Sequence, residues 1–162
     1  MVTHAHHQIV SHVSNLCTKI SQLFPFPELV AFHVHTVVDK NFTAGDNIKF
    51  KTELFNTGNG YNLDDGVFTS PDSGVYIFTA NFCISKGFNL GYSFVKEEET
   101  IITGTLYGCD GPNCATPSAV VMLQKNERLT IRCRDGPCQD AFVDDSVGTN
   151  TFSGALISMT HR

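Results

Sequence analysis

The sequence predicts an all-β sandwich that follows a short N-terminal helix. Three observations support this: apolar and polar residues alternate after position 27, turns rich in Gly, Asn, Asp and Pro recur at regular spacing, and no helical spacing follows Pro27. About ten short strands fit between the turns. We therefore divide the chain into a helical, coiled-coil segment at 1–27 and a β domain at 28–162.

Composition and charge exclude several classes of protein. Charged residues make up 17% of the 162 residues, which argues against disorder and against a coiled coil throughout. The length is sufficient for one domain with a buried core. A formal net charge of -5, with no block of Lys or Arg, disfavours a nucleic-acid partner. No apolar run reaches transmembrane length, so we expect no membrane insertion.

The N-terminal segment has the apolar spacing of a coiled coil. Positions four and three residues apart are apolar except for one histidine; they are Val2, His6, Ile9, Val13, Leu16, Ile20 and Leu23. An amphipathic helix packed on its own domain is the alternative. Phe24-Pro25-Phe26-Pro27 ends the helix because proline lacks a backbone N–H and disfavours helix before it. Cys17, beside the seam, is either a bridge between subunits or a free thiol.

The first strand is expected at Val30–Val38. Alternation places four side chains toward the core, namely Val30, Phe32, Val34 and Thr36. His33 and His35 then share the opposite face. A His-x-His pair can ligate metal, but two histidines do not complete a site, so interface histidines are the simpler interpretation.

The clearest alternation follows the turn Pro71-Asp72-Ser73-Gly74. Here one face of the strand is aromatic and apolar, and its predicted core residues are Tyr76, Phe78, Ala80 and Phe82, with Phe68 just before the turn. Further strands are expected at 48–56, 88–95, 100–107, 118–123, 129–133 and 150–160. We interpret Lys96-Glu97-Glu98-Glu99 as a solvated turn and Asn126 as a left-handed turn residue.

Four of the six cysteines form two matching units, Cys109-Asp110-Gly111-Pro112-Asn113-Cys114 and Cys133-Arg134-Asp135-Gly136-Pro137-Cys138. Each unit encloses an Asp-Gly-Pro turn, which favours the disulfides Cys109–Cys114 and Cys133–Cys138. The alternatives are crossed pairing, Cys109–Cys138 with Cys114–Cys133, and a zinc site, although the spacing is wider than in a zinc knuckle. Cys83 is interpreted as an inert core thiol.

Disulfides imply an oxidising compartment, so we expect a secreted, extracellular protein. The sequon Asn41-Phe42-Thr43 predicts glycosylation of Asn41 and agrees with that location. The N-terminus lacks the charged and apolar regions of a signal peptide. Either Met1 begins the mature form, or the protein is cytosolic.

One set of residues resembles a known family signature. An Asn-x-x-x-x-Tyr segment, followed by Gly-x-Phe-x-x-Pro-x-x-Gly-x-Tyr-x-Phe, is similar to the signature of the complement C1q globular domain; here its residues are Asn56, Tyr61, Gly66, Phe68, Pro71, Gly74, Tyr76 and Phe78. The resemblance covers about residues 28–160, and no Gly-X-Y repeat of a collagen stalk is present. It implies a ten-stranded jelly roll, shared with tumour necrosis factor, that assembles as a homotrimer.

In a jelly roll, the loops 109–117 and 133–150 project from the same pole. They hold one basic residue, Arg134, and the aspartates Asp110, Asp135, Asp140, Asp144 and Asp145. Clustered carboxylates on constrained loops suit calcium. The alternative is an acidic, merely solvated apex. We further expect Asp110, Arg134 and Asp135 to contact the ligand.

The resemblance sharpens the calcium prediction for Asp110. In complement heads, an Asp directly after the Cys that ends the corresponding strand contributes to calcium binding, and Asp110 matches this position. The family's disulfide partner for that cysteine, one strand earlier, is Gly91 in this chain. The disulfide scheme must therefore differ from the family's.

No nucleophile elbow, phosphate loop or HExxH motif is present, so we predict a protein that is not an enzyme. The resemblance implies a pattern-recognition protein of innate immunity that binds microbial polysaccharides, acidic glycans or lipopolysaccharide through multivalent, lectin-like contacts. The alternative is a trimeric signalling or scaffolding ligand, similar to cerebellin or adiponectin, that binds a protein receptor. The heptads favour two-stranded coils, but we expect the larger head interface to impose a trimer.

Overall fold

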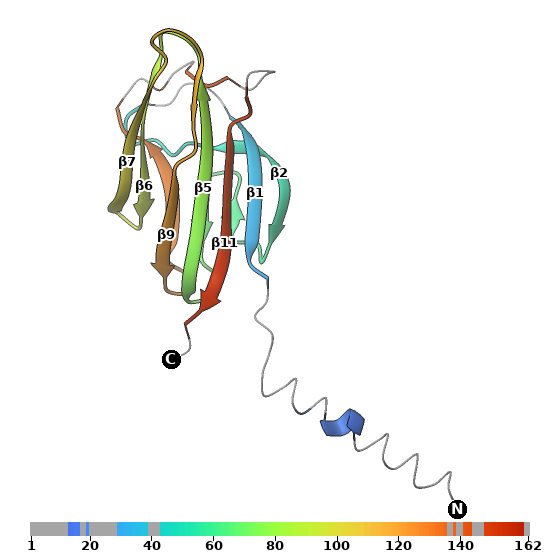
Figure 1. Cartoon of the computed structure of the whole chain (residues 1–162). Helices are drawn as coiled ribbons and strands as arrows, with labels where there is room; N and C mark the ends of the chain where they lie inside the picture. The colour runs from blue at the N-terminus through green and yellow to red at the C-terminus, as the bar shows by residue number, and fades with distance from the viewer. Residues whose placement is uncertain are drawn as a thin grey trace, which may run out of the picture.

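Two antiparallel sheets pack face to face in this computed structural model, which describes residues 13–16, 19, 29–38, 43–135, 138, 141–143 and 148–160 (Figure 1). In chain order the strands are β1 (Ala31–Val37), β2 (Phe50–Thr57), β3 (Tyr61–Asn62), β4 (Val67–Thr69), β5 (Gly74–Ile84), β6 (Asn89–Lys96), β7 (Glu99–Tyr107), β8 (Asn113–Ala115), β9 (Ser118–Leu123), β10 (Arg128–Cys133) and β11 (Thr151–Met159). Sheet A has the order β2-β1-β11-β5-β8, with β9 also on β5, and sheet B has the order β3-β4-β10-β6-β7. The predicted all-β jelly-roll sandwich is confirmed.

The predicted coiled-coil segment lies almost entirely outside the described residues. The chain is helical at 13–16 and at 19, and Val13 and Leu16 are exposed there. The seam of the coiled coil and the state of Cys17 therefore stay predictions. The sequon at Asn41 also lies outside the described residues, so glycosylation stays a prediction too.

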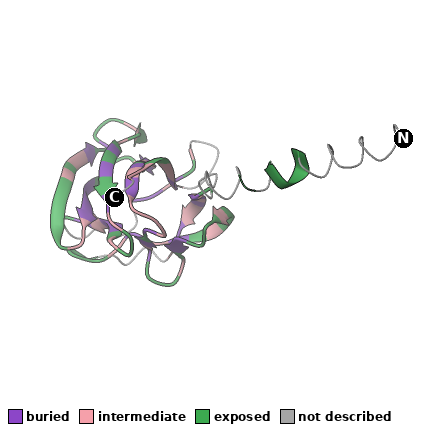
Figure 2. Ribbon diagram, turned by 90° about the horizontal axis from the view of Figure 1, so that it is seen from below, coloured by how far each residue is buried: buried purple, intermediate pink, exposed green. Residues whose placement is uncertain are grey.

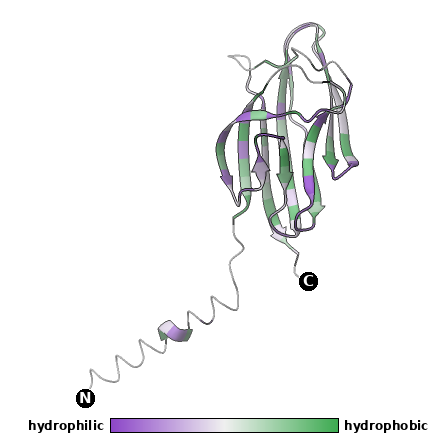
Figure 3. Cartoon of the chain, turned by 180° about the vertical axis from the view of Figure 1, so that it is seen from behind, coloured by the Kyte–Doolittle hydropathy of each residue, from purple (hydrophilic) through white to green (hydrophobic). Residues whose placement is uncertain are grey.

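The core lies between the two sheets and consists largely of aromatic rings. Figure 3 shows hydrophobic and hydrophilic residues in alternating bands along the strands, and Figure 2 views the buried residues along the strand direction. The predicted core residues of β5 are all fully buried: Tyr76, Phe78, Ala80 and Phe82. Phe68 of β4 meets Phe78 edge-on, with ring centroids 5.2 Å apart. The period-two pattern therefore placed the core correctly on this strand.

The first strand departs from the predicted alternation at Thr36. Val34 is buried as expected, but Thr36 has a φ of 62° and is only partly buried. Its amide donates a hydrogen bond to the carbonyl of Asn150 at 3.0 Å. A residue in the left-handed region reverses the alternation, so Val37, rather than Thr36, faces the core.

Three short strands, β3, β4 and β8, are not predicted by the sequence. Strands of two or three residues hold too little of the alternating pattern to be recognised. The signature residue Asn56 is hydrogen-bonded to Tyr61, the first residue of β3. Its side chain accepts a hydrogen bond from the Tyr61 amide at 3.1 Å and donates one to the Tyr61 carbonyl at 2.8 Å. The spacing between Asn56 and Tyr61 therefore reflects a closed turn.

The sequence predicted a solvated turn between β6 and β7. In the structure, two glutamates of this turn instead form hydrogen bonds with β10. The carboxylate of Glu98 accepts two hydrogen bonds from the guanidinium of Arg132, at 2.9 and 3.2 Å. Glu97, with a φ of 53°, accepts one from the amide of Arg128 at 2.7 Å. The hydrogen bond from Arg132 lowers the pKa of Glu98. These hydrogen bonds hold the turn against β10.

Asn126, in the turn between β9 and β10, adopts its predicted left-handed conformation, with a φ of 70°.

Candidate functional site

Two disulfides lie at the end of the sandwich where β5, β7 and β10 finish, which we call the apex (top in Figure 1). Cys133 is bonded to Cys138, as predicted from the turn between them. Cys83 is bonded to Cys114, and Cys109 is an exposed free thiol. The predicted Cys109–Cys114 bond is therefore wrong, as are the crossed pairing and the interpretation of Cys83 as a free core thiol.

Strand register explains the unexpected bond. Cys83 of β5 stands directly opposite Cys114 of β8, and their Cα atoms are 4.1 Å apart. The 109–114 and 133–138 turns both enclose Asp-Gly-Pro between two cysteines, but the second cysteine of the first turn, Cys114, belongs to a strand that pairs with β5. β8 has only three residues and cannot be recognised in the sequence. The pairing of Cys114 with Cys83 could therefore not be predicted.

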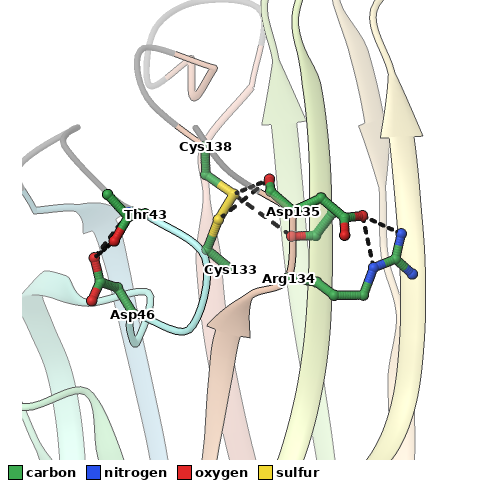
Figure 4. Close-up of a disulfide and its surroundings, with 7 residues drawn as sticks. Thr43, Asp46, Cys133, Arg134, Asp135 and Cys138 are labelled. Atoms are coloured by element: carbon green, nitrogen blue, oxygen red, sulfur yellow. Dashed lines mark hydrogen bonds and ion pairs between the residues drawn. A yellow bond between two sulfur atoms is a disulfide. The ribbon is translucent and has the colours of Figure 1, made fainter.

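The Cys133–Cys138 bond closes a loop that carries Arg134 and Asp135 (Figure 4). Asp135 Oδ2 accepts a hydrogen bond from Arg134 Nε at 2.7 Å and another from Arg134 Nη2. Arg134 Nη2 also donates to Thr105 Oγ1 of β7 at 2.8 Å, which holds the guanidinium against sheet B. The pairing lowers the pKa of Asp135 and raises that of Arg134, so both stay charged at neutral pH.

Gly91 of β6 makes room for this ion pair. A Cβ atom at position 91 would lie 2.5 Å from Asp135 Oδ2, well inside van der Waals contact. The Arg134 amide donates to the Gly91 carbonyl at 2.8 Å, which keeps the loop close to β6. The glycine found where the resembled family has a cysteine therefore allows the Asp135 side chain to lie over the strand.

A pocket of about 400 Å³ opens beside the ion pair, a volume within the range of ligand sites. We call it the apex pocket; the residues that line it include Phe88, Asn89, Thr105, Tyr107, Arg134 and Asp135. Phe88 and Tyr107 are 39% and 56% exposed. The lining residues from β6 and β7 are not among the ligand-binding residues expected from the sequence. The hairpin predicted at 88–107 could have indicated them, because Asn89 and Tyr107 are cross-strand partners at its open end.

The structure describes two of the five aspartates predicted to bind calcium, Asp110 and Asp135. Asp140, Asp144 and Asp145 lie outside the described residues. Asp110 is exposed and does not line the apex pocket, and Asp135 is paired with Arg134. Among the residues that the structure describes, no group of three or more His, Cys, Asp or Glu could hold a metal ion. These residues alone do not fit calcium, so calcium binding stays a prediction.

His33 and His35 lie on the outer face of sheet A. His33 Nδ1 is 2.6 Å from Ser153 Oγ of β11, and its ring stacks on Phe55 of β2 with centroids 6.3 Å apart. Burial, and to a smaller extent the nearby His35, lowers the pKa of His33. No third ligand joins the two histidines among the described residues, so the arrangement fits the interface interpretation better than a metal site.

We expect mild acid to destabilise the fold through His33. Because its pKa is lower in the folded protein than the usual 6.5, the unfolded chain binds the proton first. The stabilisation present above pH 6.5 is then lost as the pH falls through the folded pKa. Between about pH 7.5 and 5.5, carboxylates contribute little, since they titrate near pH 4. When the pH is lowered across this range, thermal denaturation should show a smaller decrease in Tm for His33→Gln than for wild type. Equal decreases would contradict the assignment.

The outer face of sheet A also carries a row of apolar side chains, most of them exposed, with Ala155 partly buried. Val120 of β9, Ile77 of β5 and Ala155 of β11 are successive cross-strand partners. Val120 is 66% exposed and Ile77 38%. Met122, the next outward residue of β9, is exposed as well. Contiguous apolar patches are uncommon on monomeric proteins, so this row marks a surface suited to association.

Comparison with known proteins identifies the sequence relationship. The family model of the C1q domain matches residues 31–157. The human protein Multimerin-2 is 29% identical over 118 residues, which are 72% of this chain and 12% of that protein. Human Complement C1q and tumor necrosis factor-related protein 9B is 28% identical over 140 residues, which are 86% of this chain and 41% of that protein. The chain thus spans less than half the length of either relative.

Solved structures show the same architecture at lower identity. The globular domain of zebrafish Complement 1qA protein has a TM-score of 0.67 at 18% identity, covering 81% of this chain and 99% of that one. Eiger TNF from S. frugiperda has a TM-score of 0.63 at 12% identity, covering 83% and 96%. At these identities the likeness shows a shared fold and no more.

Proposed function

Because the chain belongs to the C1q domain family, we propose that it is a secreted homotrimer whose heads bind microbial surface glycans in an innate immune role. The observation that supports glycan binding most directly is the apex pocket, where exposed aromatic rings adjoin hydrogen-bonding side chains. Each head would bind weakly, and three linked heads would gain avidity on a repetitive surface. In this role the protein binds its ligand and catalyses no reaction.

The two disulfides support the proposed extracellular location. Cys83–Cys114 and Cys133–Cys138 are stable in an oxidising compartment, which supports secretion. Within the part of the chain that the structure describes, no helix has the length and apolar character needed to cross a membrane.

The apolar row on sheet A supports the trimer. We expect wild-type protein at micromolar concentration to be a trimer by light scattering, and Val120→Lys to shift it toward monomer. A lysine charge inside a subunit interface would lose its hydration without a partner, which is strongly unfavourable. The control is Ile101→Lys, an exposed apolar residue of β7 in the other sheet, which should stay trimeric. A stable dimer or monomer of wild type would refute the trimer.

A glycan array probed with and without calcium tests the ligand. We expect saturable binding to microbial polysaccharides that free sugar competes away. Binding to no glycan, together with saturable binding to one cell-surface protein, would instead support a signalling ligand with a standard protein interface.

Calcium is tested separately by calorimetry on wild type and Asp110→Asn. If Asp110 contributes to a site, millimolar calcium should release heat and raise the Tm of wild type more than that of the variant, because ligand binding stabilises the folded state. No heat and no rise in Tm would leave the acidic loops simply solvated.

A further inference from the structure

We infer that the apex pocket binds a neutral sugar ring at the end of a glycan, in preference to an acidic sugar or a phosphate. This inference rests on the proposed glycan-binding function and deepens it: it names the class of ligand and the residues that contact it. The ligands expected from the sequence included acidic glycans and lipopolysaccharide, and the inference restricts that set to neutral sugars.

The apolar part of the pocket suits one face of a pyranose ring. Phe88 precedes β6 and Tyr107 ends β7, so both rings stand at the open end of one hairpin. Both are substantially exposed, and each therefore presents apolar surface to solvent. A sugar ring carries a face of C–H groups, and packing that face against an aromatic ring removes apolar area of both from water.

The polar part of the pocket suits adjacent hydroxyl groups. Asp135 Oδ2 is occupied by Arg134, whereas Asp135 Oδ1 and Arg134 Nη1 have no partner among the described residues. A sugar hydroxyl both donates and accepts hydrogen bonds. Two neighbouring hydroxyls can therefore donate to the carboxylate and accept from the guanidinium, in charge-assisted hydrogen bonds that are stronger than neutral ones.

The charge balance disfavours an anion. Arg134 is the one cation among the described residues that line the pocket, and Asp135 neutralises it. A sulfate, carboxylate or phosphate placed there would face the Asp135 carboxylate, or would have to displace it from Arg134. Like charges across a contact are costly, and the chain's net charge of -5 adds to the repulsion.

The test is an NMR titration of the wild-type protein with three probes: methyl α-mannoside, methyl β-galactoside and a heparin-derived disaccharide. We expect at least one neutral glycoside to bind and to shift signals of the lining residues, with the acidic disaccharide binding more weakly. Tyr107→Ala and Arg134→Gln should each weaken the neutral glycoside about tenfold or more, because each removes a central contact. Both side chains are exposed, and an unchanged Tm confirms that the variants fold.

Two further variants sharpen the result. Arg128→Gln is the matched control, because Arg128 forms an exposed ion pair with Glu97 at the opposite end of β6, and binding should be unchanged. Gly91→Ala removes no hydrogen-bonding atom but should weaken binding, because its Cβ displaces the Asp135 carboxylate. Preferential binding of the acidic disaccharide, or neutral binding unaffected by Tyr107→Ala and Arg134→Gln, would overturn the inference.

The polysaccharide array separates this inference from the proposed function. If Tyr107→Ala and Arg134→Gln bind microbial polysaccharide as well as wild type does, the protein is a glycan binder and the apex pocket is not its site. If wild type binds neither polysaccharide nor any glycoside, the proposed function fails and the inference fails with it.

Discussion

Phe78→Ala should lower the free energy of unfolding by about 3–5 kcal/mol, the range for deleting a buried aromatic side chain. Phe78 is fully buried in β5, and its ring lies 5.2 Å from that of Phe68 and 6.1 Å from that of Phe152. Its cross-strand partner is Gly154, where a Cβ would lie 2.7 Å from the Phe78 ring. The ring therefore fills space that a glycine leaves open, and alanine would create a cavity.

Urea denaturation at one fixed protein concentration measures this effect, since assembly contributes to apparent stability. The matched control is Phe88→Ala, the same substitution at an exposed phenylalanine, which should change the free energy of unfolding by about 0.5 kcal/mol or less. If the two variants have similar denaturation midpoints, Phe78 does not lie in the core and the register of β5 is wrong.

Replacing Cys83 and Cys114 with alanine should cost about 3.5–4 kcal/mol, and replacing Cys133 and Cys138 only about 2 kcal/mol. The first bond joins residues 31 positions apart and the second joins residues 5 apart. A longer closed loop removes more conformational entropy from the unfolded chain, so breaking it costs more. Alanine is chosen because Cys83 and Cys138 are buried, and a serine hydroxyl there would need a partner.

Denaturation of the two double variants against wild type checks the order of the effects. Peptide mapping without reduction checks the connectivity, and should recover Cys83 with Cys114 and leave Cys109 alkylated. A peptide that joins Cys109 to Cys114 would contradict the structure and restore the pairing that the local turn suggests. Equal costs for both double variants would show that loop length does not govern the stabilisation.

The sequence by itself determined the class of fold and most of the core. Alternation along a strand is a local property, so the buried face of β5 could be read from neighbouring residues. β9 runs from Ser118 to Leu123, as predicted, and the signature from Asn56 to Phe78 identified the family that the comparisons show. Asn126 could be assigned a left-handed conformation because few residue types adopt it.

Only the tertiary structure decided which residues meet across strands. The turns at 109–114 and 133–138 carry the same local signal, yet one closes its own disulfide and the other gives its second cysteine to β5. The apex pocket likewise needs the open end of one hairpin and a loop that follows β10. A turn's composition determines its preferred backbone conformation, whereas a disulfide or a pocket depends on distances between segments that only the packed sheets bring together.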